Sequence, residues 1–86
     1  MNSQTTVRFW KCYTALPDQI KKRAKEAYSL FNINPYHPSL HFKRVHSHRP
    51  IFSVRISKDY RALGVLQNDI IIWFWIGSHS DYDKLL

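Results

Sequence analysis

The sequence predicts an α+β fold, in which one N-terminal helix packs on one face of a small, mostly antiparallel sheet of four or five strands. Three observations support this class. One amphipathic segment lies near the N-terminus, alternating or apolar segments crowd the second half of the chain, and short connections join those segments. Short connections cannot make parallel crossovers, so the strands they join are expected to be antiparallel. We expect residues 1–86 to form a single domain.

The first half of the chain is expected to hold one strand and one helix. Residues 6–13, TVRFWKCY, alternate and are rich in aromatic and β-branched side chains, which predicts a strand. Residues 17–34 show apolar side chains at helical spacing, at Ile20, Ala24, Ala27, Tyr28 and Phe31. Pro17 suits the first turn of a helix, because the N–H that proline lacks would have no partner there. Asn34 and Pro35 are expected to end the helix.

Four strands are expected in the second half, over residues 40–45, 51–57, 60–67 and 70–76. In IFSVRIS, alternation directs Phe52, Val54 and Ile56 to the core face and Ser53, Arg55 and Ser57 to the polar face. Residues 70–76 are apolar on both faces, which predicts a central strand. Residues 78–86 are expected to form a short helix or a loose tail.

Composition excludes several classes of protein. The single cysteine, Cys12, excludes an internal disulfide and a zinc site of paired cysteines. The longest apolar run, IIIWFWI, is far shorter than the roughly 20 residues of a membrane helix, and no signal peptide is recognisable. We therefore expect a cytoplasmic protein without membrane contact. Four histidines, at 37, 41, 46 and 48, lack a recognised ligand spacing, so we expect neither a metal nor another cofactor.

The charge of the chain favours a polyanionic partner. Thirteen Lys and Arg against six Asp and Glu give a net charge of +7, which suits nucleic acid or an acidic protein. The positive charge is concentrated in residues 37–61, at Lys43, Arg44, Arg49, Arg55, Lys58 and Arg61, against the single acid Asp59. Lys43, Arg44, Arg49 and Lys58 are therefore candidate RNA contacts.

The C-terminal strand predicts a reactive group at its end. If extended geometry persists through Gly77, one face carries the alternate residues Ile71, Trp73, Trp75, Gly77 and His79. Arg55 and Arg61 are then expected on the open face with His79 near its rim, and Trp73 or Trp75 beside them as a stacking surface for a base. Fixed cations and an imidazole are what metal-free RNA cleavage needs, since a proton must leave the 2′-hydroxyl and another must reach the departing 5′-oxygen.

The same residues also fit structural roles. His79 could be a surface or capping residue, Arg55 and Arg61 could be solvated residues that pair with Asp59 or Asp69, and the two tryptophans could pack in the core or an interface.

A resemblance covers almost the whole chain. The segment FSVRISKDYRALGVLQNDIIIWFWIGSHSDYDKLL resembles the C-terminal half of the RelE/ParE superfamily of bacterial toxin–antitoxin toxins. Members typically carry an arginine in the third strand, a tyrosine and arginine opening the fourth, and a glycine and histidine after the last. Here these are Arg55, then Tyr60 with Arg61, then Gly77 with His79. The resemblance implies a RelE-like fold, in agreement with the class predicted above.

The resemblance also implies a function, which is ribosome-dependent cleavage of messenger RNA by 2′-hydroxyl attack without a metal. The resemblance implies that Arg55 and Arg61 hold the scissile phosphate and that His79 is the general acid or base. His37, in a YHPSL that resembles the HPL of the YafQ-like branch, is a candidate for a second proton transfer, and Lys43 falls in a region of substrate-binding lysines. The expected partners are a cognate antitoxin, in a hetero-oligomer, together with the ribosome and mRNA.

The chain departs from the family pattern in two places. One branch places a tyrosine or phenylalanine four residues past the histidine, where this chain has Asp83. Tyr82 comes one residue early and is a possible further catalytic residue. ParE-type gyrase inhibitors often have two helices between the first two strands, where the sequence predicts one. Two alternatives to an mRNA endoribonuclease remain open: a non-enzymatic gyrase inhibitor and an inactive RNA-binding relative.

Overall fold

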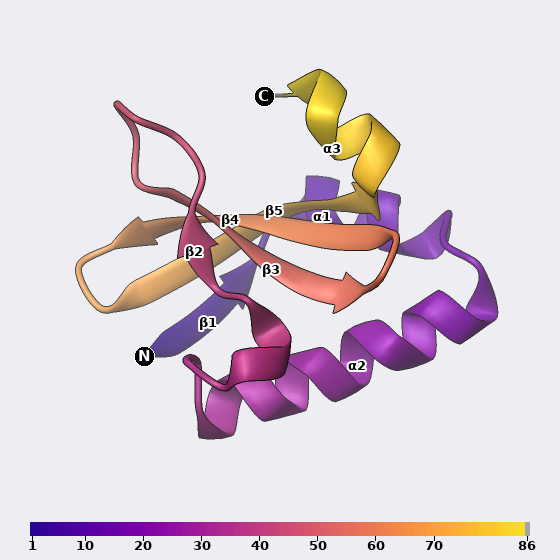
Figure 1. The fold of residues 1–86 in the computed structure, drawn as a ribbon, viewed down its shortest axis with the longest axis horizontal. Helices are drawn as coiled ribbons and strands as arrows, with labels where there is room; N and C mark the ends of the chain where they lie inside the picture. The colour runs from indigo at the N-terminus through magenta and orange to yellow at the C-terminus, as the bar shows by residue number, and fades with distance from the viewer. Residues whose placement is uncertain (86) are drawn as a thin grey trace.

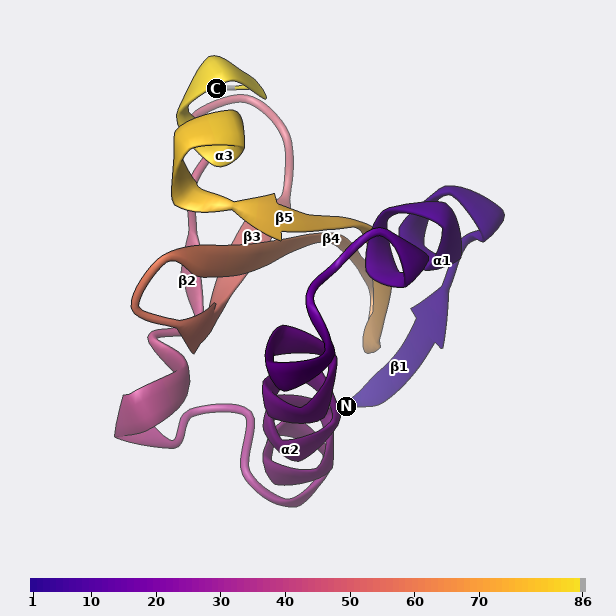
Figure 2. The ribbon, with the colours of Figure 1, turned by 90° about the vertical axis from the view of Figure 1, so that its right-hand side faces the viewer.

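The computed structural model describes residues 1–85 and confirms the α+β class. Its elements are β1 (Asn2–Thr5), α1 (Val7–Thr14), α2 (Asp18–Ile33), the 3₁₀ turn η1 (Pro38–Leu40), β2 (Lys43–Arg44), β3 (Ile51–Ser57), β4 (Tyr60–Gln67), β5 (Ile70–Ser78) and α3 (His79–Leu85). The five strands form one sheet in the order β1-β5-β4-β3-β2, in which only β1 and β5 are parallel. Helix α2 covers one face of this sheet and α3 lies on the other (Figures 1 and 2).

The N-terminal strand differs from the prediction. Residues 6–13, expected as a strand, fall almost entirely in helix α1, and the strand is the polar segment β1 that precedes it. Thr6 begins the helix, because its side-chain oxygen accepts the N–H of Phe9 at 3.1 Å. Phe9 and Tyr13 are one helical turn apart, and their rings stack at 6.5 Å. Two helices, not one, therefore lie between β1 and β2.

Helix α2 confirms the predicted amphipathic segment. It begins after Pro17 and ends at Ile33, beyond which the Asn34 N–H still donates to the Leu30 carbonyl. Its buried residues, Ala24 and Phe31, face the sheet, where the Phe31 ring meets Trp73 edge-on at 5.3 Å. Burial of this aromatic pair helps to hold the helix on the sheet, and truncating such a ring to alanine costs about 3–5 kcal/mol.

The strands of the second half follow the prediction except at the first. Strands β3, β4 and β5 lie where they were expected, with β5 inside the sheet and two residues longer. The strand expected over residues 40–45 is reduced to the two residues of β2. Leu40 instead ends η1, and His41 takes a left-handed conformation with φ 47°, which interrupts extended backbone before β2.

A register shift in β5 decides which side chains face α2. Leu63 pairs with Trp75 and the next residue, Gly64, pairs with Trp73, so Phe74 is an extra residue in β5. Trp73 therefore joins the core beneath α2, while Trp75 points to the opposite face and packs over Gly77. The expectation that both indoles share one face is wrong, because a bulge shifts the alternation by one residue.

Within residues 1–85, none of the helices combines the length and the apolar composition that crossing a membrane requires.

Candidate active site

Two arginines are paired across neighbouring strands at the end of the sheet next to the β3–β4 turn. Arg55 of β3 pairs directly with Arg61 of β4, which in turn pairs with Gly77 of β5. Directly paired residues of antiparallel strands project to the same face, with Cβ atoms about 4.5–5.5 Å apart. Like charges in such a pair are unfavourable for stability, so this row costs folding free energy and concentrates positive charge.

Arg61 is held by the turn between β3 and β4. Its Nη1 donates to the carbonyl oxygens of Ser57 at 2.7 Å, Tyr60 at 2.9 Å and Lys58 at 3.4 Å. These bonds satisfy turn carbonyls and fix the guanidinium in place. All three use Nη1, so among residues 1–85 the donors on Nε and Nη2 are not engaged in hydrogen bonds. Neither the resemblance nor the spacing indicated this anchoring.

Arg55 occupies the free edge of the sheet. Strand β2 pairs only with Phe52 and Ser53, so within residues 1–85 the edge of β3 opposite β4 is unpaired beyond Ser53. There Arg55 and Lys58 line a groove of about 310 Å³ together with Arg23 of α2. Three cations therefore border this edge, with Glu26 as the one acid in the lining.

His79 joins the same turn from the C-terminal side. Its backbone N–H donates to the carbonyl oxygen of Asp59 at 2.6 Å, at the point where β5 passes into α3. Helix α3, which begins at His79, lies on the face of the sheet away from α2 (Figures 1 and 2). The His79 side chain is 48% exposed, which leaves the ring accessible to a ligand.

The imidazole of His79 has two neighbours within α3. The Tyr82 ring stacks on it at 5.4 Å with an interplanar angle of 20°, and its Nε2 lies 3.6 Å from Oδ2 of Asp83. A carboxylate at this place can hold the orientation of the ring. Sequence reasoning treated Asp83 only as a departure from the family pattern. The signal for its role was its spacing, because residues four apart on a helix are neighbours.

His37 is not brought together with His79. Its Nδ1 accepts the N–H of Ser39 at 3.2 Å and lies 2.9 Å from the Ser39 hydroxyl, so the ring caps η1. That turn lies on the α2 side of the sheet, whereas α3 lies on the other (Figure 2). A lone histidine often caps a helix, and His37 has that structural role here.

The candidate RNA contacts divide into exposed cations and buried rings. Lys43, Arg44, Arg49 and Lys58 are all exposed, in β2, the β2–β3 loop and the β3–β4 turn. The β2–β3 loop rises on the same side of the sheet as α3 (Figure 1). Trp73 and Trp75 are only 4% and 7% exposed. The expectation of a stacking surface is therefore corrected, because neither indole presents a free face to a base.

Within residues 1–85, no group of three or more His, Cys, Asp or Glu side chains is arranged to hold a metal ion.

Known structures share this fold. The toxin–antitoxin RelB–RelE complex of Methanococcus jannaschii matches with a TM-score of 0.78 and 22% identity over 96% of this chain and 99% of that one. YafQ from Escherichia coli matches with a TM-score of 0.75 and 13% identity over 94% and 96% of the two chains. The E. coli DinJ–YafQ toxin–antitoxin complex matches with a TM-score of 0.75 and 12% identity over 93% of each. No curated protein matches the chain in sequence.

A mostly antiparallel sheet of this order with α2 on one face matches the class of RelE-like folds. The particular family is indicated by sequence as well, since the ParE-like toxin domain matches residues 18–84. The chain belongs to the ParE-like toxin family and is a toxin–antitoxin toxin of the RelE/ParE superfamily.

Proposed function

We propose that this toxin is a ribosome-dependent mRNA endoribonuclease that inhibits translation by cleaving RNA without a metal. The observation that supports this most directly is the convergence of Arg61 and His79 on one turn, with Arg55 paired to Arg61 across the strands. Rigid cations beside an accessible imidazole provide charge stabilisation and proton transfer in one place.

The proposed reaction is attack by the 2′-hydroxyl of RNA on the adjacent phosphorus. The 2′-oxygen loses its proton and bonds to phosphorus, the bond to the 5′-oxygen breaks, and that oxygen leaves with a proton. Arg55 and Arg61 neutralise the additional negative charge on the phosphate, and the imidazole of His79 transfers one of the two protons. Asp83 positions His79 from the next turn of α3.

The partners follow from the charge and the family. The exposed cations Lys43, Arg44, Arg49 and Lys58, in β2, the β2–β3 loop and the β3–β4 turn, would contact the phosphates of mRNA or ribosomal RNA in the cytoplasm. A cognate antitoxin completes the system. Two of the similar structures are complexes of a toxin with its antitoxin, RelB with RelE and DinJ with YafQ.

The test is cleavage of a defined mRNA on programmed 70S ribosomes by the purified toxin, in the Mg²⁺ that the ribosome itself needs, with mapping of the new ends. Ribosome-dependent cleavage that leaves a 2′,3′-cyclic phosphate and a 5′-hydroxyl, the ends that attack by the 2′-hydroxyl produces, is the expected result. Binding of RNA without cleavage would instead identify an inactive RNA-binding relative.

A non-enzymatic ParE-like toxin that inhibits DNA gyrase is the second candidate. Two observations favour it: the matching family is described as ParE-like, and two helices, α1 and α2, lie between the first two strands. The sequence predicted one helix between the first two strands, which was an argument against a ParE-like toxin. The structure has two helices there, so that argument no longer applies. A gyrase supercoiling assay run in parallel separates the two, since the gyrase reading predicts inhibition of supercoiling and intact mRNA.

A further inference from the structure

A hollow of about 430 Å³ lies where the β2–β3 loop meets strands β3, β4 and β5. Its lining comprises Ile51, Val65 and Phe74 from the three strands, Gln67 at the end of β4, and Arg49 and Pro50 of the loop. A volume of this size is within the range of small-ligand sites. None of the proposed catalytic residues lines it, so the cleavage mechanism does not account for it.

This hollow lies on the face of the sheet opposite α2. Ile51, Val65 and Ile72 are directly paired across β3, β4 and β5, so their side chains share one face. The next row of the sheet contains Phe52 and Trp73, which pack in the core with residues of α2. Because side chains alternate along a strand, the row of Ile51 faces the other way, toward the side from which the β2–β3 loop rises (Figure 1).

Phe74 contributes an aromatic ring to the hollow because of the bulge in β5. Trp73 and Trp75 are buried, whereas Phe74, the extra residue between them, is partly exposed and stays outside the core on the α2 side. Proteins that bind single-stranded RNA stack unpaired bases on such rings. The stacking surface that the sequence predicted at the two indoles is therefore available at Phe74 instead.

The loop wall of the hollow is held in place by hydrogen bonds. The Arg49 N–H donates to Nδ1 of His46 at 3.0 Å, and the Arg49 carbonyl accepts the N–H of Ile51 at 2.8 Å. The Pro50 carbonyl accepts the N–H of Leu66 in β4 at 2.9 Å. Because these bonds preorganise the wall, a ligand does not have to order the loop when it binds.

The polar groups of the hollow indicate the nature of its ligand. Arg49 is in the lining, and Lys43 and Arg44 precede it in β2. Within residues 1–85, the lining contains no acidic side chain. Gln67 is exposed, and its side-chain amide can both donate and accept hydrogen bonds. An aromatic ring, an amide and a nearby cation match the face of a base, its edge and its phosphate.

The position of the hollow relative to the candidate active site favours an RNA strand over an acidic peptide. Ile51 and Arg55 belong to the same strand and are four residues apart, which is about 13 Å in extended backbone. A stacked nucleic-acid strand rises about 3.4 Å per nucleotide, so roughly four nucleotides or fewer span this distance. One RNA strand can therefore reach the hollow while its scissile phosphate lies at Arg55.

We infer that the hollow binds one unpaired base of the RNA substrate, which stacks on Phe74, with its edge at Gln67 and its phosphate at Arg49. The inference rests on the proposed RNA cleavage and adds a specificity site a few nucleotides from the bond that breaks. Since an amide side chain distinguishes the edges of different bases, Gln67 gives the toxin a nucleotide preference at that position.

The test measures binding of the full-length toxin to 70S ribosomes programmed with a defined mRNA. The mRNA carries 2′-deoxyribose at the cleavage position, so that no hydroxyl can attack. An abasic site is then moved along this mRNA one nucleotide at a time. We expect one abasic position to weaken binding by at least about fivefold, the lower end of the effect of base–aromatic stacking. Phe74→Leu should remove this effect, because the base and the ring act through one interaction.

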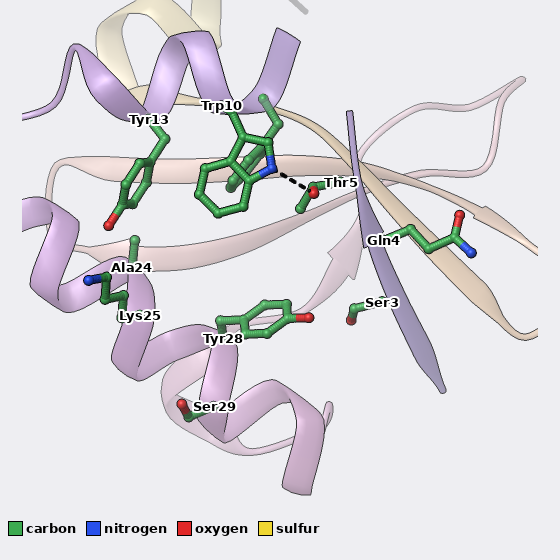
Figure 3. Close-up of a pocket in the computed structure, with 10 residues that line it drawn as sticks. Ser3, Gln4, Thr5, Trp10, Tyr13, Ala24, Lys25, Tyr28 and Ser29 are labelled. Carbon is green, nitrogen blue, oxygen red and sulfur yellow. Dashed lines mark hydrogen bonds between the residues drawn. The ribbon is translucent and has the colours of Figure 1, made fainter. Parts of the chain in front are cut away.

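Two further variants separate base recognition from folding. Gln67→Ala changes an exposed residue and should reduce the differences in affinity among the four bases at the sensitive position by at least about fivefold. Tyr28→Leu is the matched control for Phe74→Leu, because Tyr28 lines a separate cavity of about 450 Å³ between β1, α1 and α2 (Figure 3). This control should bind the programmed ribosome as the wild type does.

The outcomes distinguish this inference from the cleavage proposal. Binding that is insensitive to every abasic site, or an abasic effect that persists in Phe74→Leu, would overturn the inference and leave the cleavage proposal intact. A toxin that does not bind the programmed ribosome at all would overturn both. If Phe74→Leu weakens binding of the antitoxin and not of the mRNA, the hollow is a protein contact and the inference is wrong.

Discussion

The backbone N–H of His79 donates a 2.6 Å hydrogen bond to the carbonyl oxygen of Asp59, in the same turn whose other carbonyls hold the guanidinium of Arg61. The end of β5 and the β3–β4 turn are thereby joined through backbone and side-chain bonds. A substitution at either residue can therefore be designed to remove a functional group while the backbone link stays intact.

His79→Gln tests the proton transfer. Glutamine keeps the backbone N–H that bonds to Asp59 but cannot exchange a proton near neutral pH. Since general acid–base catalysis contributes about 10²–10⁴-fold, we expect ribosome-dependent cleavage to fall by at least about 100-fold. Thermal unfolding should stay close to wild type, and Ser80→Ala serves as the exposed control. Cleavage at the wild-type rate would exclude His79 from the mechanism.

Arg55→Gln and Arg61→Gln should differ in stability while both lose cleavage. Arg61 makes charge-assisted bonds to the turn, so its loss should lower the free energy of unfolding by about 1.5–3 kcal/mol. Arg55→Gln relieves a directly paired like charge and should be neutral or stabilising by up to about 1 kcal/mol. Urea unfolding followed by tryptophan fluorescence measures both. Equal destabilisation by the two substitutions would contradict the anchoring assigned to Arg61.

Asp83→Asn tests the positioning of His79. The amide removes the charge that faces Nε2 at 3.6 Å, and we expect cleavage to fall by about tenfold with little change in substrate affinity. The effect should vanish in a His79→Gln background, because the two residues then act through one interaction. Asp81→Asn is the matched control, since Asp81 pairs with Lys84. Additive effects of the two substitutions would refute the coupling.

Gly77→Ala tests the close packing at the end of β5. A Cβ at this position would lie 2.5 Å from Cζ2 of Trp75, so the indole would have to move. We expect a loss of about 1–3 kcal/mol in the free energy of unfolding, together with a change in tryptophan fluorescence. Substitution to serine should be similarly costly. An unperturbed alanine variant would mean that the Trp75 ring does not occupy the space over Gly77.

Much of the fold and part of the candidate site were accessible from local patterns. The helical spacing of Ala24 and Phe31 predicted α2, and alternation in residues 51–57 predicted β3 with the correct face for Val54. These elements are predictable because each buries one face against the sheet, and burial leaves a period in the sequence. The same alternation placed Arg55 and Arg61 in candidate positions on the sheet.

Tertiary structure decided the features that leave no local period. Strand β1 is polar and joins the sheet by pairing with β5, so nothing in NSQT indicated a strand, while the aromatic residues after it packed as a helix. The bulge at Phe74 separates Trp73 from Trp75 by satisfying two packing contacts at once, one with Phe31 and one over Gly77. The hydrogen bond from Arg61 to the β3–β4 turn likewise forms only once folding brings the residues together. The same is true of the contact between Asp83 and His79. The sequence determined which residues alternate and which recur along a helix, and the packing of side chains from separate elements decided where that alternation breaks and which charges meet.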